Sequence, residues 1–384
     1  MGRTSVSLVL ALVVAGACAS SQTVTVAAVP GPPVDNTSTR PDTSTRGSAG
    51  AAPARGVVRG GVGWRIESRE HVDLWLHGFA LLQDDASLVP YFRPGYRSGL
   101  VSVRPADGAF DASRSQLQRR FSENANLASA QFLALYFASW DDLRRGVERF
   151  VRDNGDVRQA RTQEELRMYA TVRTYFPTAD DRDWLRLFVQ GLDDERTRFY
   201  RGYWLQQQQR RGSMRSAIET LWAGTYRTAF TPFMRNSMQR DGVILLSLPL
   251  GGEGRTLSVG GNDNFVSVTF PGDQEDPRDA LYVVAHEVVG TVATAAVRDN
   301  TSAADERSGD TGKWTTLAAV RGGAMLLERI APDLLAGYQR YYLRLARATV
   351  PTGDPSASFN ATFPLPAQIV TALQRQIEIV LGGI

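Results

Sequence analysis

The chain has 384 residues, and its 43 Lys plus Arg against 40 Asp plus Glu give a formal net charge of +3. Its 43% hydrophobic content excludes a wholly disordered chain and is enough for one large or two ordinary domains. Lys313 is the only lysine, and the arginines are mixed with acidic residues, so the charge does not point to nucleic acid as a partner. The chain has a single cysteine, which excludes disulfides within it.

The first 17 residues have the pattern of a signal peptide, with a positive charge before an apolar run over residues 6–14. Ala15-Gly16-Ala17-Cys18 resembles the lipobox of bacterial lipoproteins, with Ala15 in place of the commoner Leu. The resemblance implies cleavage before Cys18, lipidation of Cys18 and a membrane as partner. Ala19 differs from the aspartate that resembles an inner-membrane retention signal in enteric lipoproteins, so the outer membrane is expected. An ordinary secretory signal with an unrelated cysteine is the alternative.

Residues 18–63 are predicted to form a flexible tether. They are rich in Ser, Thr, Ala, Gly and Pro and have few large apolar residues, so they cannot bury enough surface to fold. Such a tether would let a lipid-anchored domain stand away from the membrane. Beyond it, no apolar run is expected to be long enough to span a bilayer.

Residues 64–240 are predicted to be helical. In the first segment, Val72, Trp75 and Phe79 recur at helical spacing. The predicted helices are Glu70–Gln83, Ala112–Phe121, Leu127–Phe137, Trp140–Asn154, Gln163–Phe176, Asp181–Gln209 and Ser213–Tyr226. Their many Arg and Gln residues suit outer faces in contact with water, while aromatic residues pack inward.

The pattern changes at residue 241, where short apolar segments replace helices. Strands are predicted at Val243–Leu248, Thr256–Val259 and Phe265–Phe270. The intervening Gly251-Gly252-Glu253-Gly254 lacks the Gly-Lys-Ser/Thr ending of a phosphate loop, so we interpret it as a turn. Hairpin-like strands of this kind predict a short antiparallel sheet.

Helices return after the strands. Asp276 and Pro277 are start signals for a helix over Ala280–Val297. Later helices are predicted at Trp314–Ile330, Pro332–Thr349 and Pro366–Leu381. The predicted fold class is therefore α+β and mostly helical, with a helical region over 64–240 and a second region over 241–384.

His286 and Glu287 lie in the middle of this apolar helix and are followed by Val288-Val289-Gly290. Zinc proteases carry H-E-x-x-H, in which two histidines one turn apart bind zinc and the glutamate is the general base. Gly290 occupies the place of the second histidine. The order of strands, His-Glu helix and following helix over about 242–344 resembles the glutamate-zincin metallopeptidases. The resemblance implies His286 as a metal ligand and Glu287 as the base.

The ligand set of such a site is incomplete. In the glutamate-zincins a glutamate of the following helix is the third ligand, but here Glu306 precedes that helix and Glu328 lies near its end. A catalytic zinc site needs about three protein ligands and an open position, so no metal cofactor is expected. His77 could act as a replacement ligand, or it could be a hydrogen-bonded core histidine.

A buried His-Glu pair calls for a compensating partner, because unpaired buried charges are costly. Arg321 on the following helix is predicted to pair with Glu287 as a structural substitute for the lost metal. Tyr338, Tyr341 and Tyr342 could line a cleft and stabilise an oxyanion, or they could pack in the core with their hydroxyls at a wet edge.

These features predict an exported, lipid-anchored envelope protein with a degenerate metallopeptidase-like domain, a pseudoenzyme without peptidase activity. Its cleft is expected to bind a peptide or an envelope protein along the edge of Phe265–Phe270, by main-chain pairing. One alternative is an active zinc metallohydrolase that uses His286, a distant His and Glu, and Glu287 as base. The other is a purely structural envelope lipoprotein.

Overall fold

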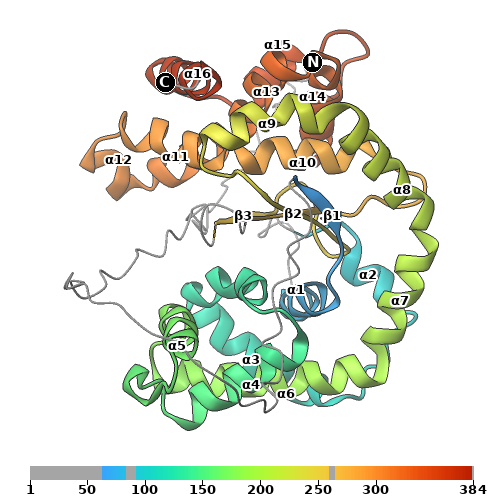
Figure 1. Ribbon diagram of the computed structural model, residues 1–384, viewed down its shortest axis with the longest axis vertical. Coiled ribbons are helices and arrows are strands. Elements are labelled where there is room, and N and C mark those ends of the chain that lie inside the picture. Colours follow the sequence, from blue (N-terminus) through green and yellow to red (C-terminus); the bar gives the residue numbers. More distant parts are fainter. Residues whose placement is uncertain (1–62, 84–91, 259–263, 383–384) are drawn as a thin grey trace, which may run out of the picture.

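The computed structural model describes residues 63–83, 92–258 and 264–382 (Figure 1). These residues form an α+β fold that is 70% helical and contains a small mixed sheet of four strands, which confirms the predicted fold class. The predicted signal peptide, Cys18 and almost all of the predicted tether lie outside the described residues.

The sheet has the strand order β1-β2-β4-β3. Its strands are β1 (Arg65–Glu67), β2 (Gly242–Ser247), β3 (Arg255–Ser258) and β4 (Asn264–Thr269). β1 and β4 both run parallel to β2, and β3 pairs antiparallel with β4. The prediction of an antiparallel sheet was therefore wrong for two of the three pairings. The reason is that β3 turns back one position away from β2, and β4 then fills the space between them.

This strand order also corrects the predicted binding edge. β4, which covers most of Phe265–Phe270, is paired on both sides, whereas β1 and β3 are the edge strands. All six residues of β2 are buried, as is typical of a central strand with both faces covered. β1 comes from the other side of the predicted boundary at residue 240, so the sheet joins both regions.

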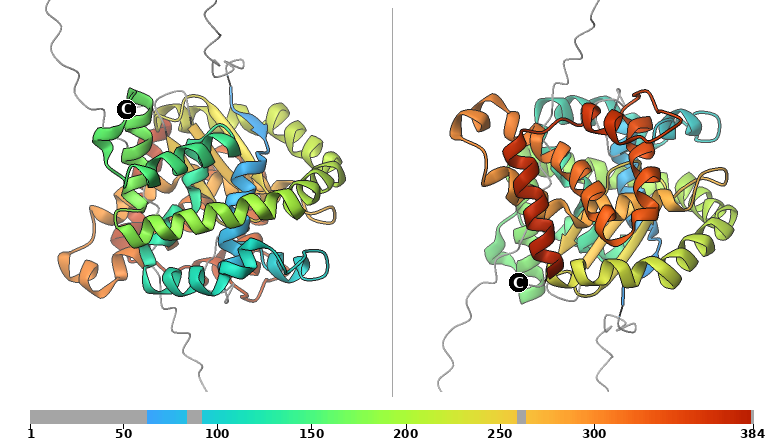
Figure 2. Two further views of the ribbon diagram at one scale, coloured as in Figure 1. Left: turned by 90° about the horizontal axis from the view of Figure 1, so that it is seen from below. Right: turned by 90° about the horizontal axis from the view of Figure 1, so that it is seen from above.

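Helices cover both faces of the sheet (Figures 1 and 2). We call the helices below the sheet in Figure 1 the lower layer. They are α1 (Glu70–Leu82), α2 (Tyr96–Leu100), α3 (Ala109–Glu123), the 3-10 helix η1 (Ala125–Tyr136), α4 (Trp140–Arg152), the short 3-10 turn η2 (Val157–Gln159), α5 (Gln163–Tyr175) and α6 (Ala179–Glu195). Aromatic side chains such as Trp75, Phe79 and Phe188 pack against one another at its centre.

A nearly continuous helical path runs past the β1 side of the sheet to its other face (Figure 1). It continues from α6 through η3 (Arg196–Tyr200), α7 (Arg201–Arg210), α8 (Gly212–Leu221), η4 (Trp222–Tyr226) and α9 (Arg227–Asn236). Both η3 and η4 are π-helical turns. The last helix was not predicted, and it contains Pro232 in its interior.

The C-terminal helices form the upper layer. They are α10 (Arg278–Val288), α11 (Gly290–Arg298), α12 (Ala303–Ser308), α13 (Asp310–Ile330), α14 (Pro332–Leu345), α15 (Ser356–Thr362) and α16 (Ala367–Gly382). The predicted helix over Ala280–Val297 is thus divided at Val289, between α10 and α11.

The combined stretch Arg278–Arg298 is long enough to cross a membrane, and an 18-residue window within it has a mean hydropathy of 1.6. This corrects the expectation that no later run has that length. However, 72% of the apolar stretch is buried within the fold, where α10 packs against β4 and α13. We therefore interpret it as the core helix of the upper layer.

Candidate functional site

The His286–Glu287 pair lies in the last turn of α10, beside the start of β3. His286 is only 5% exposed, and its Nδ1 lies 2.9 Å from Glu287 Oε1. The same carboxylate oxygen accepts a hydrogen bond of 2.8 Å from the Gly254 backbone N–H. The hydroxyl of Thr256 in β3 donates to the Glu287 backbone carbonyl at 3.0 Å. Glu287 therefore fastens α10 to the edge strand.

The other side of the imidazole is covered by α14. The rings of His286 and Tyr342 are stacked, with centroids 5.5 Å apart and planes at 21°. The Tyr342 hydroxyl donates to Gly252 O, and the Tyr338 hydroxyl donates to Val320 O, each at 2.8 Å. Both tyrosines are buried, so this geometry favours the core-packing interpretation over an oxyanion-binding one.

The loop before β3 approaches its neighbours too closely for side chains at two of its glycines. A Cβ at Gly254 would overlap the backbone carbonyl of Ser267, and a Cβ at Gly252 would overlap the side chain of Leu345. The glycines that the sequence marks as a turn therefore allow the loop to lie against β4 and α14. This approach brings Glu253 into the electrostatic field of His286, a proximity that the sequence did not reveal.

The charges in this cluster favour a protonated imidazole. Burial alone would lower the pKa of His286, but the hydrogen bond to Glu287 and the negative charges of Glu287 and Glu253 together raise it above 6.5. Burial and the Glu287 charge raise the pKa of Glu253, against the opposing effect of His286 and Arg255. The protonated form of His286 is therefore stabilised by a small cluster that also contains two carboxyl groups.

The residues of this cluster do not fit a catalytic zinc ion. His286 Nε2 is buried and has no hydrogen-bond partner among the described residues, so one potential ligand atom is present. A Cβ at Gly290 would meet open space, so no other side chain has taken the place of the second histidine. Within 63–83, 92–258 and 264–382, no group of three His, Cys, Asp or Glu side chains could hold a metal ion.

The proposed substitute ligands are elsewhere. His77 is completely buried in the lower layer, with Nδ1 3.0 Å from the Tyr96 hydroxyl and Nε2 3.2 Å from Glu195 Oε1. Both ring nitrogens are thus engaged in a separate network. Glu306 on α12 and Glu328 on α13 are exposed. The structure brings none of these three residues to His286.

The predicted Glu287–Arg321 pair is not formed. Arg321 Nη1 donates to the backbone carbonyl of Phe363 at 3.3 Å, and no described acidic side chain forms an ion pair with it. Burial lowers the pKa of the Arg321 guanidinium. The Glu287 carboxylate is compensated by the neighbouring imidazole and by the Gly254 N–H, so it does not require Arg321.

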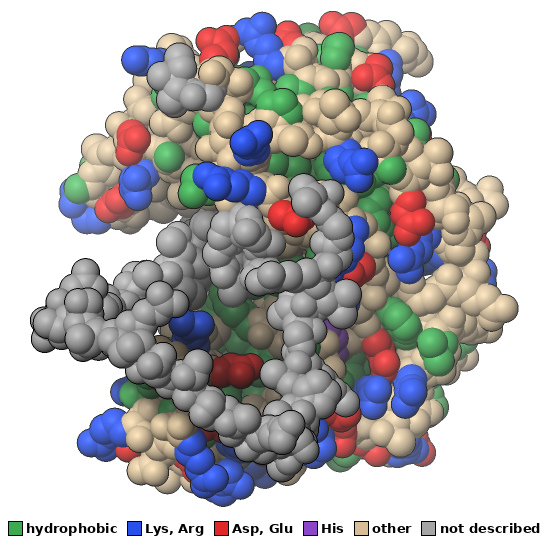
Figure 3. All heavy atoms as spheres, in the orientation of Figure 1, with side chains coloured by type: hydrophobic (Ala, Val, Ile, Leu, Met, Phe, Trp, Pro, Cys, Tyr) green, Lys and Arg blue, Asp and Glu red, His purple; other side chains and the backbone are tan. Residues whose placement is uncertain are grey.

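A hollow lies between the upper and lower layers at the β3 end of the sheet. It is visible on the left of Figure 3, which has the orientation of Figure 1. β3 is the last strand at that end, and Arg255 extends from it over the ring of Phe132 in η1 with its Cζ 5.2 Å from the ring centroid. At this end of the sheet, the contact between Arg255 and Phe132 thus links the edge strand to η1.

The chain matches no family model, and neither the curated proteins nor the solved structures gave a match. The resemblance to the glutamate-zincins therefore rests on the His286–Glu287 pair and the arrangement of elements around it. In this arrangement, an edge strand antiparallel to its neighbour lies directly beside the His-Glu helix.

Proposed function

We propose that this protein is an exported envelope lipoprotein whose degenerate metallopeptidase-like cleft binds extended peptides without cleaving them. The observation that carries the proposal is the attachment of edge strand β3 to α10 through Glu287, at the end of the sheet where a hollow separates the two layers. An edge strand offers unpaired backbone N–H and C=O groups, and an extended peptide can add to them by main-chain pairing.

The absence of hydrolysis in this proposal is supported by the state of Glu287. One carboxylate oxygen of Glu287 accepts from both Gly254 N–H and His286, so the side chain is fixed against the loop before β3. The raised pKa of His286 also disfavours metal binding, because only the neutral imidazole is a ligand. The pair is better suited to holding the strand in place than to activating water.

The two faces of β3 indicate which side chains of a bound peptide would be recognised. Thr256 faces α10, and Arg255 faces η1. Side chains of an added strand would alternate between the same two directions. Because Arg255 is the charged group at this edge, acidic side chains facing η1 should strengthen binding.

Casein, an unfolded protein with many extended segments, is a suitable probe for the proposal. The purified chain should bind casein and leave it intact, and bound casein should slow hydrogen exchange in residues 254–258. Metal-dependent cleavage of casein that is lost in Glu287→Gln would instead support the metallohydrolase alternative. If casein neither binds nor protects β3, the peptide-binding proposal is wrong and a purely structural lipoprotein remains.

Proline substitution can test whether the strand edge itself binds. In an antiparallel pair, successive N–H groups point alternately toward the partner strand and away from it. Of Thr256→Pro and Leu257→Pro, one therefore removes an outward N–H and should abolish casein binding with little more loss of stability than the alanine variant of the same residue. The other removes a ladder hydrogen bond and should lower the melting temperature. Unchanged casein binding in both variants would exclude the β3 edge.

The anchor can be tested separately from the cleft. Cys18→Ser should release the protein from the membrane fraction and abolish incorporation of labelled palmitate. Release into the soluble fraction supports lipidation at Cys18. Membrane association that persists in the variant would contradict it, and it would leave the peptide-binding proposal unaffected.

A further inference from the structure

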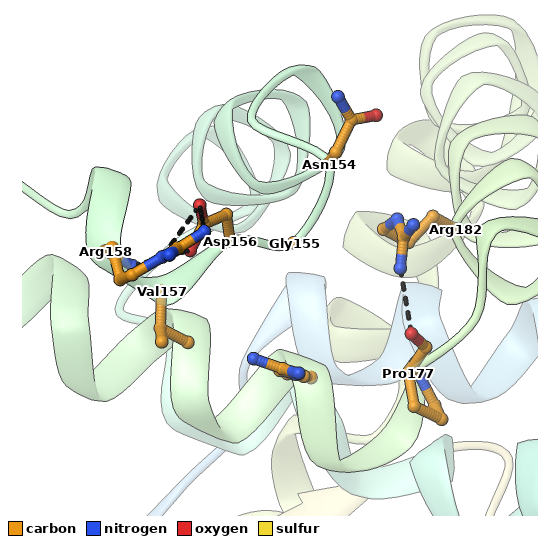
Figure 4. A pocket seen from close by; sticks show the side chains of 8 residues that line it. Asn154, Gly155, Asp156, Val157, Arg158, Pro177 and Arg182 are labelled. Atoms are coloured by element: carbon orange, nitrogen blue, oxygen red, sulfur yellow. Dashed lines mark hydrogen bonds and ion pairs between the residues drawn. The ribbon is translucent and has the colours of Figure 1, made fainter.

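A polar pocket of about 490 Å³ lies in the lower layer, among the turn after α4, the end of α5 and the start of α6 (Figure 4). Asn154 and Gly155 both have left-handed backbone conformations, with φ of 54° and 69°, and reverse the chain there. A Cβ at Gly155 would lie 3.3 Å from Arg182 Cδ, so the glycine leaves room for the stem of that arginine. The turn thus forms one wall of the pocket and supports Arg182.

The pocket is lined by three arginines and one carboxylate. Asp156 forms an ion pair with Arg158, whose Nε and Nη2 donate to it at 2.9 and 2.8 Å (Figure 4). Hydrogen bonds from the Arg158 side chain and backbone N–H, together with the charges of Arg158 and Arg173, lower the pKa of Asp156 to about 2. Asp156 therefore stays ionised, and its hydrogen bonds go to Arg158 and not to Arg173 or Arg182.

Two guanidinium groups of the pocket have no ion-pair partner among the described residues. Arg182 donates to the Pro177 backbone carbonyl at 2.9 Å, and neither it nor Arg173 forms an ion pair with a described acidic side chain. Both line the same pocket, so an anion bound there would lie near two positive charges. We propose that this pocket binds a phosphate group through Arg173 and Arg182. A guanidinium offers a planar fork of N–H donors that matches phosphate oxygens, and a phosphate has enough acceptors to satisfy two such forks.

The test uses the purified full chain at low ionic strength, where exposed charges are least screened. Inorganic phosphate is titrated calorimetrically, and binding is measured in parallel to phosphatidylcholine vesicles with and without phosphatidic acid. Saturable binding of one phosphate per chain identifies a free phosphate as ligand. Binding only to vesicles that contain phosphatidic acid identifies a lipid headgroup. The absence of both would overturn the proposal.

Arg173→Gln should weaken binding by about tenfold or more, because charge-assisted hydrogen bonds are lost. Arg182→Gln should have the same effect. Because Arg182→Gln also removes the hydrogen bond to the Pro177 carbonyl and could disturb the fold, Arg173→Gln is the decisive variant. Arg167→Gln is the matched control, since Arg167 is exposed on the same helix as Arg173 but does not line the pocket. If it weakens binding as much as Arg173→Gln, the attraction is one of diffuse surface charge and the pocket is not a site.

Discussion

Two buried histidine–glutamate pairs, one in each layer, differ in what balances the carboxylate. In the lower layer, Glu195 accepts from His77 and also from Arg104, which donates to it at 2.8 and 2.9 Å and is paired with Asp111 as well. In the upper layer, Glu287 has only His286 and the Gly254 N–H. Only the first pair contains a permanent cation.

The two histidines also differ in the balance between burial and the charges around them. Burial lowers the pKa of His77 despite the opposing effect of Glu195, whereas the carboxyl groups around His286 outweigh burial and raise its pKa. Both ring nitrogens of His77 have partners, but His286 Nε2 has none in the part of the chain that the structure describes. In the first pair, both ring nitrogens are hydrogen-bonded within the core. In the second pair, Nε2 of His286 is left without a described partner, next to an edge strand. This difference is what makes the second pair a candidate site.

The largest expected effect comes from removing the cation of the lower pair. Arg104→Met would leave Glu195 and Asp111 without their guanidinium partner, and it should cost about 4 kcal/mol of unfolding free energy in urea. The pKa of His77 should rise in the variant, so the lower pair would come to resemble the upper one. Arg144→Met is the control, because it removes an exposed pair with Glu148 and should cost no more than about 0.5 kcal/mol. A loss below about 1 kcal/mol for Arg104→Met would contradict the assigned role.

The next largest effect tests the attachment of the upper pair to β3. Gly254→Ala would force a methyl group against the Ser267 carbonyl and displace the N–H that Glu287 accepts, with an expected cost of about 3 kcal/mol. Gly290→Ala meets open space in a helix, so it should be neutral or stabilise by about 0.5 kcal/mol. Both values can be measured by urea unfolding. Equal stability of the two variants would show that the loop is not fixed against β4.

A pH series should separate the two histidines by sign. His286 has a raised pKa, so its stabilising contribution should be present below pH 6.5 and be lost as the pH rises through the folded value. His77 has a lowered pKa, so its contribution should be present above pH 6.5 and be lost as the pH falls. Unfolding free energies of His286→Gln, His77→Gln and the parent chain should be compared between about pH 5.5 and 8.5.

At the acid end of that series, His286→Gln should cost about 2 kcal/mol, the scale of a hydrogen bond to a charged group. Glu253 and Glu287 face the imidazole, and Tyr342 covers its ring. Glu253→Gln should therefore reduce the change of unfolding free energy with pH that His286 produces. The reason is that one of the two carboxyl groups that raise the pKa of His286 is removed. If the contributions of His286 and His77 to the unfolding free energy changed with pH in the same direction, the opposite shifts of their pKa values would be contradicted.

The smallest expected effect concerns Arg321, which the sequence wrongly assigns to the upper pair. Arg321→Ala should lose its hydrogen bond to Phe363 O, at a cost of about 1 kcal/mol. Because Arg321 and Glu287 do not interact, Arg321→Ala and Glu287→Gln should be additive within about 0.5 kcal/mol in a double-mutant cycle. A larger coupling energy would restore the predicted pair.

Periodicity located most helices, because their buried faces are set by local sequence. For α1, the predicted Glu70–Gln83 differs from the observed Glu70–Leu82 by one residue. The strand order was not accessible in the same way, because β2 and β4 pair in parallel although β3 lies between them in the sequence. β1 was missed because its three residues include a single apolar side chain, Ile66.

At the candidate site, the sequence identifies His286, Glu287 and the missing ligand at Gly290, because these depend on spacing along one helix. It does not reveal Glu253 or the stacking of Tyr342, since both contacts join elements distant in the chain. Two glycines that flank Glu253 were the available signal. They indicate close approach of the backbone but not what it approaches.

The position of β1 has a consequence for the order in which the molecule can assemble. Arg65, Ile66 and Glu67 pair with Val243, Ile244 and Leu245, and the carbonyl of Trp64 accepts a hydrogen bond from Trp222. A nascent chain therefore exposes this segment long before its partners are synthesised, and such non-local pairing slows folding. Until β1 docks, β2 presents an open and mostly apolar strand to other chains, which makes this docking the step at which aggregation competes with folding.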